Sequence, residues 1–177
     1  MPTPGFQELL PEGGPEPLRV RDRAGAGYQG VKEDRTFIEE YVSLRNRYRE
    51  LLLTKPVTAE ETLKWLQESS IEARAIVHGS HLVGVAILYL SRKGEIALFA
   101  KYPNKGLGTR LLKIIEEVAK EKELHHLWAW VLRDNWAAQR TFKKNGYTVE
   151  RESSKVYEHK RWKGIIFRKD ILQGRTL

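Results

Sequence analysis

The sequence has no cysteine among its 177 residues, so the chain forms no disulfide, holds no metal through thiolates and uses no cysteine nucleophile. It also lacks a long apolar stretch. The longest run, residues 82–90, has nine residues, about half of the ~18 that a membrane-spanning helix needs. The first residues carry neither the basic nor the apolar region of a signal peptide. We therefore expect a cytoplasmic protein that has no membrane as a partner.

Proline is scarce outside the first 17 residues, which hold five of the seven prolines. Few apolar residues accompany them, so we expect residues 1–17 to be a flexible tail. Residues 18–172 are expected to form one domain, because 41% hydrophobic and 31% charged residues is an ordinary globular composition. Residues 173–177 form a C-terminal tail. Residues 25–30 match the glycine pattern of dinucleotide-binding loops, but charged segments flank them, so we interpret them as a surface loop.

Charged residues are unevenly spread along the chain, which has a net charge of +8. Residues 101–177 hold 18 Lys/Arg against 9 Asp/Glu, whereas the residues before them are close to neutral. This excess indicates that something anionic binds the C-terminal part: a phosphorylated cofactor, a nucleic acid or an acidic surface. A solvated basic face without a ligand is the alternative interpretation.

Hydrophobic periodicity alternates between helical and strand spacing, which predicts a mixed α/β domain. Apolar residues at helical spacing predict a helix over residues 37–53, which Pro56 ends. Thr58 and Glu61 form a capping-box pattern that opens a second helix, ending near residue 69. Two further helices are expected over residues 106–121 and from Asp134 or Asn135 to residue 145.

Strands are expected where β-branched and aromatic residues gather between turn residues. The expected strands cover residues 18–22, 73–77, 82–90, 95–100, 124–132, 147–150, 155–160 and 164–171. Residues 160–163 are expected to connect the last two.

The segment 96–112 combines a strand, a short glycine-bearing loop and a helix start. In such a segment several unpaired backbone amides point at one place, and the positive end of the helix dipole adds to their attraction for an anion. Gly106 and Gly108 would let a phosphate approach the backbone without interference from a Cβ atom. Positive charge around them comes from Lys101 and Lys105. The segment therefore predicts a phosphate site; glycines that only allow a helix to begin are the alternative.

Two motifs in this half of the chain occur together in one known family. Residues 103–108, Pro-Asn-Lys-Gly-Leu-Gly, are similar to the pattern (Gln/Arg)-x-x-Gly-x-(Gly/Ala). The second pattern, Asn-x-x-Ala-x-x-x-Tyr-x-x-x-Gly-(Phe/Tyr), is met by Asn135, Ala138, Phe142, Gly146 and Tyr147. With both motifs in order, residues 18–171 resemble the GNAT N-acetyltransferase superfamily. Residues 44–46, 58–65 and 99–106 also resemble its branch that acetylates nucleotide-linked 4-amino sugars; an ordinary surface cation at Arg45 and a core aromatic at Trp65 are the alternative interpretation.

The resemblance implies the GNAT fold: α/β, with a mixed, mostly antiparallel central sheet of six to seven strands flanked by four helices. It implies acetyl-CoA as co-substrate, whose phosphates suit the basic C-terminal part. The diphosphate would lie on backbone amides of the 103–109 loop, at Asn104, Lys105, Gly106, Leu107, Gly108 and Thr109. The pantetheine arm would pair with Leu98, Phe99 and Ala100, where a β-bulge would free an amide for the thioester. Asn135 would hydrogen-bond the arm, and Ala138 would leave it room.

Two residues depart from the family's patterns. Pro103 stands where a Gln or Arg is usual, which removes one side chain and one amide donor from the phosphate loop. Phe142 stands where a tyrosine usually protonates the departing thiolate. A thiol has a pKa near 8.5, so the thiolate can leave unprotonated and take its proton later from water or from Tyr157. Phe142 would then pack beside the thioester without a catalytic role.

Amine acetylation also requires a base, because an ammonium ion has no lone pair with which to attack. Glu95 is our candidate, since it begins the strand along which the cofactor would lie and members of this superfamily often place a glutamate base there. A solvated glutamate after the turn at Lys93 and Gly94 is the alternative. No constellation of metal ligands stands out, so we expect no metal.

The leading hypothesis is an N-acetyltransferase that transfers acetyl from acetyl-CoA to a primary amine by direct attack in a ternary complex. The acceptor would be a small amine, an amino sugar or a protein amine, and the enzyme a monomer or homodimer. A noncatalytic acetyl-CoA-binding module, suggested by Phe142, is the second hypothesis. A nucleic-acid-binding domain is the third, although no nucleic-acid motif supports it.

Overall fold

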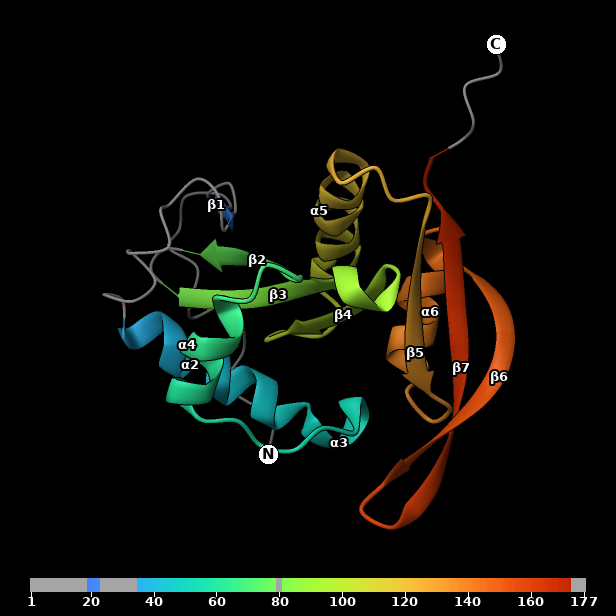
Figure 1. Cartoon of the computed structure of the whole chain (residues 1–177), viewed down its shortest axis with the longest axis horizontal. Helices are drawn as coiled ribbons and strands as arrows, with labels where there is room; N and C mark the ends of the chain where they lie inside the picture. The colour runs from blue at the N-terminus through green and yellow to red at the C-terminus, as the bar shows by residue number, and fades with distance from the viewer. Residues whose placement is uncertain (1–18, 23–34, 79–80, 173–177) are drawn as a thin grey trace.

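The computed structural model describes residues 19–22, 35–78 and 81–172 (Figure 1). The tails expected at residues 1–17 and 173–177 and the glycine segment 25–30 lie outside these ranges. The order of helices and strands in the described chain alternates as the periodicity predicts, so the α/β class is confirmed.

A seven-stranded sheet forms the centre of the molecule, in the order β1-β2-β3-β4-β5-β7-β6. All neighbouring strands are antiparallel except β4 and β5, which are parallel. The predicted mixed, mostly antiparallel sheet is therefore confirmed. The strands are β1 (Arg19–Asp22), β2 (Ile71–His78), β3 (His81–Tyr89), β4 (Glu95–Ala100), β5 (His126–Leu132), β6 (Thr148–Tyr157) and β7 (Lys160–Asp170).

Helices cover both faces of this sheet (Figure 1). They are α2 (Arg35–Arg47), α3 (Arg49–Leu52), α4 (Ala59–Leu66), α5 (Leu107–Glu121) and α6 (Trp136–Lys144). A short 3-10 turn, η2 (Leu90–Arg92), joins β3 to β4. Ile96 belongs to the core under α5 and α6, whereas Phe99 belongs to the core under α2 and α4. Because alternate residues of a strand face opposite sides, these two residues fix the faces of β4.

The predicted first helix is interrupted at Tyr48. This residue leaves helical geometry (φ −95°, ψ 4°), and its hydroxyl donates a hydrogen bond to the Ala100 carbonyl at the end of β4. Leu53 then adopts a left-handed conformation (φ 50°) that ends α3. The break explains why the described chain has five helices where four were expected.

The capping box at the start of α4 is confirmed in both directions. The Glu61 amide donates to the Thr58 hydroxyl over 3.2 Å, and the Thr58 amide donates to the Glu61 carboxylate over 2.9 Å. Two amides that a helix start leaves unpaired are satisfied in this way.

The prediction of three short terminal strands was wrong. Two long strands, β6 and β7, meet at a turn in which Glu158 and His159 both have positive φ, 49° and 61°. Residues 160–163, expected as a connection, lie inside β7. The polar residues 151–154 indicated a loop because few apolar residues mark them, yet β6 is the sheet's edge strand and most of its side chains are exposed. An edge strand needs no apolar face to continue its backbone ladder.

Candidate functional site

The parallel strands β4 and β5 separate soon after they meet. Within the described chain they share one register pair, Glu95 opposite Trp128, where the Trp128 amide donates to the Gly94 carbonyl over 3.1 Å. From there β4 continues along β3, and β5 continues along β7 (Figure 1). The β4 edge that faces β5 is thereby left without a partner strand over residues 96–100. An extended ligand can add to such an edge as if it were another strand.

The register of β4 corrects one expectation. Residues Glu95 to Ala100 pair with β3 without interruption, so the expected β-bulge is not there. A bulge is also not needed, because alternate residues of a paired strand already point their amides and carbonyls to the other side. The last carbonyls of the strand are engaged by α2 and its end: Ala100 accepts from Tyr48, and Lys101 accepts from Arg47 over 2.6 Å.

The loop after β4 leads directly into α5. Gly106 is the residue before the helix, with φ +72°, and α5 has no side-chain cap at this end. Asn104 also has positive φ, 58°. A Cβ atom on Gly106 would meet no atom within 4 Å, so open space lies beside this backbone. Amides at an uncapped helix start beside open space are a suitable place for a phosphate.

Gly108 has a different environment from Gly106. A Cβ atom here would lie 2.9 Å from the Thr141 methyl carbon, so the glycine allows α5 and α6 to pack closely. The neighbouring Thr109 hydroxyl accepts a hydrogen bond from the Asn145 side chain over 3.0 Å, again between α5 and α6. The second glycine of the loop motif therefore has a packing role that the sequence did not reveal.

Asn135 caps the next helix. Its side-chain oxygen accepts from the Ala138 amide over 3.2 Å, and Ala138 packs against the core under α5 and α6. The interpretation from the sequence assigned Asn135 to a bound arm, and the structure adds this capping bond at the end of β5. Asn135 lies between β5 and α6, and Ala138 belongs to the first turn of α6.

Phe142 is buried, with 5% of its surface exposed. Its ring meets Tyr147 edge to face at 5.1 Å and stacks on Phe167 at 5.7 Å. Leu98 of β4 packs against the same core. The structure thus places Phe142 in an aromatic cluster beneath the opening, with no polar atom to give or take a proton.

Glu95 lies between two cations at the point where the strands separate. Its carboxylate is 3.1 Å from the Arg92 guanidinium and 4.0 Å from the Lys155 ammonium, and its side chain is only 13% exposed. Glu95 and Phe99 share one face of β4, the face under α2 and α4. Glu95 is therefore a partly buried, ion-paired group and not the solvated turn residue of the alternative interpretation.

The Lys155 ammonium lies over the Trp130 ring as well as near Glu95. It is 4.6 Å from the Trp130 ring centre, and burial lowers the pKa of the Lys155 amine. The Trp130 ring lies against Gly164 of β7, where a Cβ atom would be 2.2 Å from the ring. The Trp130 ring nitrogen is buried and has no hydrogen-bond partner. The sequence did not single out Arg92, Lys155 or Gly164. For Lys155 the one signal was the basic C-terminal part, and Arg92 lies outside that part.

Tyr157, the other candidate catalytic residue, lies at the end of β6. Its hydroxyl donates to the Thr54 carbonyl over 2.9 Å, and desolvation together with the Glu158 carboxylate raises the pKa of Tyr157. Its described hydrogen bond therefore joins the hairpin to the segment after α3 and does not involve Glu95. Tyr48, by contrast, donates a hydrogen bond to the Ala100 carbonyl of β4.

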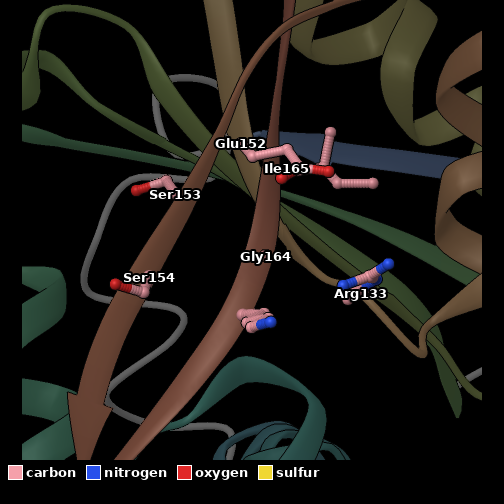
Figure 2. A pocket seen from close by; sticks show the side chains of 7 residues that line it. Arg133, Glu152, Ser153, Ser154, Gly164 and Ile165 are labelled. Atoms are coloured by element: carbon pink, nitrogen blue, oxygen red, sulfur yellow. The ribbon is translucent and has the colours of Figure 1, made fainter.

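A hollow of about 280 Å³ lies to the other side of β5 (Figure 2). Its lining comes from the end of β5 and from β6 and β7: Arg133, Glu152, Ser153, Ser154, Lys163, Gly164 and Ile165. No lining residue belongs to β4 or α5, so this hollow is separate from the opening between β4 and β5.

The described residues contain no helix long and apolar enough to cross a membrane. They also contain no group of three or more His, Asp or Glu side chains placed to hold a metal ion.

Comparison with known proteins supports an assignment for this site. Residues 35–147 match the sequence model of the acetyltransferase (GNAT) family. This region includes α2 to α6, the opening between β4 and β5, and both motifs. No curated protein sequence matches the chain significantly.

Solved structures share the fold at low sequence identity. An N-acetyltransferase from Staphylococcus aureus Mu50 has a TM-score of 0.72 and 15% identity, over 89% of this chain and 100% of that chain. Ribosomal-protein-alanine N-acetyltransferase from Brucella melitensis has a TM-score of 0.71 and 17% identity, over 86% and 99%. The protein yncA from Salmonella typhimurium, in a structure with its cofactor acetyl-CoA, has a TM-score of 0.70 and 16% identity, over 91% and 98%.

Proposed function

The chain belongs to the acetyltransferase (GNAT) family, and we propose that it transfers an acetyl group from acetyl-CoA to a primary amine by direct attack in a ternary complex. The observation that carries the proposal is the separation of β4 and β5 just beyond Glu95 and Trp128, beside the uncapped start of α5. The unpaired edge of β4 can hold the extended pantetheine arm of acetyl-CoA, and the start of α5 can hold its phosphates.

The donor fits the residues at this opening. The diphosphate would lie on the 103–109 loop, at the amides of residues 104–109, where Gly106 leaves the backbone open. The pantetheine arm would pair with the free edge of Leu98 to Ala100, next to the Asn135 cap at the start of α6. Tyr48 already holds the Ala100 carbonyl, so the arm would share or displace that bond.

In this proposal Glu95 accepts the proton of the attacking amine. It faces α2 and α4, so the acceptor would arrive from that side of the sheet, opposite α5 and α6. Proton removal by a positioned carboxylate, directly or through one water, gives the amine the lone pair with which it attacks. The thiolate leaves without help from Phe142 because that residue has no proton to give, and a thiol pKa near 8.5 makes this departure tolerable.

A noncatalytic acetyl-CoA-binding protein is the second candidate, and Phe142 is the observation that favours it. Release of free CoA thiol in the presence of a panel of primary amines separates the two candidates. Acetyl-CoA binding with no thiol release for any amine would support the second.

The donor site is tested by calorimetry with acetyl-CoA on the parent and two variants. Gly106→Val fills the open space with a branched side chain and should weaken binding by about tenfold or more, since losing contacts to a charged group has this scale. Gly146→Val is the matched control: it strains a residue with similar φ, +85°, at the end of α6. Equal affinity in the two variants would contradict the placement of the diphosphate.

A further inference from the structure

Around Glu95, on the side of the sheet from which the amine would arrive, two cations share one carboxylate. Arg92 and Lys155 both pair with the single carboxylate of Glu95, and they are 58% and 42% exposed at their side chains. Arg45 adds a third cation nearby. Its positive charge opposes the burial that raises the pKa of the Tyr41 and Tyr89 hydroxyls on the same face. Among the described ion pairs of this group, Glu95 is the one acidic member.

The position of Lys155 depends on two other residues of the sheet. Gly164 has no side chain, so the Trp130 ring lies across β7, with the Lys155 ammonium 4.6 Å from its centre. Lys155 is 4.0 Å from Glu95, the outer limit of an ion pair, whereas Arg92 is closer at 3.1 Å. The ammonium thus lies over the Trp130 ring while its charge is only loosely paired with Glu95.

A simple ammonium ion would be repelled by this group of cations, whereas an anion would be attracted to it. We propose, on the basis of the proposed function, that the acceptor carries an anionic oxygen group, a carboxylate or a phosphate, a few bonds from its amine, and that Lys155 binds this group together with Arg92. The amine of such an acceptor lies beside Glu95. Nearby cations also favour the neutral form of the amine, which is the form that attacks.

Charges of both signs lie at the mouth of this region, the tip of the β6–β7 hairpin beside α3. Together with desolvation, the Glu158 and Glu50 carboxylates raise the pKa of Tyr157 there, and the Arg49 guanidinium lowers it. They belong to the contact between the hairpin and α3, whereas Lys155 and Arg92 surround Glu95. An acceptor would therefore meet mixed charge at the mouth and net positive charge beside the base.

Two pairs of acceptors isolate the anionic group while keeping the amine the same. Glucosamine 6-phosphate is compared with glucosamine, and glycylglycine with glycylglycinamide, by kcat/KM for CoA thiol release. The parent should prefer the anionic member of at least one pair by about tenfold or more, the scale of a hydrogen bond to a charged group. A preference within the glucosamine pair indicates a phosphate group on the acceptor, and a preference within the glycylglycine pair indicates a carboxylate.

Variants then assign the preference to Lys155. Lys155→Gln should raise the KM of the anionic member with kcat kept, so that the ratio within the pair falls toward one. Lys160→Gln is the matched control. Lys160 belongs to the same hairpin as Lys155, and its ammonium also lies over a tryptophan, 4.5 Å from the Trp162 ring centre. This variant should keep the parent's ratio. Equal kcat/KM within both pairs in the parent, or an unchanged ratio in Lys155→Gln, would overturn the proposal.

A binding measurement keeps the proposal separate from catalysis. Tryptophan fluorescence of the parent should change saturably on titration with inorganic phosphate or glycylglycine, because an anion at Lys155 draws the ammonium away from Trp130. Lys155→Gln should lose this change. If the parent shows it without any CoA release, the proposed function fails while the anion site stands; if the parent shows none, the anion site is refuted.

Discussion

The Tyr157 hydroxyl donates a hydrogen bond to the backbone carbonyl of Thr54, 2.9 Å away, although the two residues are 103 positions apart. This bond ties the tip of the β6–β7 hairpin to the segment between α3 and α4. Both segments lie on the side of the sheet from which the acceptor is proposed to arrive.

Removing this hydroxyl tests whether Tyr157 positions the hairpin or donates a proton. Tyr157→Phe should raise the KM for the acceptor, leave kcat within about twofold and lower the free energy of unfolding by about 0.5–1.5 kcal/mol, the net value of one hydrogen bond. Steady-state kinetics and denaturant unfolding measure these. A fall in kcat of a hundredfold at unchanged stability would instead show that Tyr157 protonates the thiolate.

The close approach of α5 and α6 is tested by a double-mutant cycle at Gly108 and Thr141. Gly108→Ala alone places a Cβ atom 2.9 Å from the Thr141 methyl group, and crowding of this kind costs about 1–3 kcal/mol. In a Thr141→Ser background the methyl is gone, and Gly108→Ala should then stabilise the protein by up to about 1 kcal/mol through helix propensity. Denaturant unfolding gives the coupling energy. Additive effects would show that the two helices do not pack through this glycine.

The lowered pKa of Lys155 predicts how it reacts with an amine-selective acylating reagent. Burial disfavours its charged form, so Lys155 has a larger neutral fraction than an ordinary lysine at pH values between its lowered pKa and about 10.4. At pH 8–9 it should be labelled faster than Lys160, measured by mass spectrometry of peptides. The difference should shrink as the pH rises through about 10.4, where an ordinary lysine amine also becomes neutral. Slower labelling of Lys155 throughout would contradict this.

The sequence predicted the elements whose signals are local. The capping box at Thr58 and Glu61, the apolar run of β3 and the amphipathic α5 all follow from neighbouring residues, and the structure has them where expected. The break at Tyr48 was not predictable, because its hydroxyl bonds to Ala100, 52 positions away. The long β6 was missed because an edge strand carries no apolar pattern.

The same distinction applies to the site. Gly106 and Asn135 were singled out because each belongs to a motif within a short stretch of sequence, whereas the capping bond of Asn135 is apparent only in the structure. The pairing of Glu95 with Lys155 joins two strands that are separated by β5 and β7 in the sheet order, so no local pattern marks it. Gly164 likewise acquires its role only when the Trp130 ring lies on it.

The central claim is that an amine is acetylated at the opening beside Glu95, and Glu95→Gln tests it most directly. The substitution keeps the shape of the side chain and removes its basicity, so acetyl-CoA affinity by calorimetry should hardly change. The rate of CoA release at neutral pH, with any amine that the parent acetylates, should fall by about 10²-fold or more. Part of the rate should return at high pH, where more of the amine is already neutral. A pH–rate profile of Glu95→Gln that overlays the parent, with an equal plateau, would contradict the account.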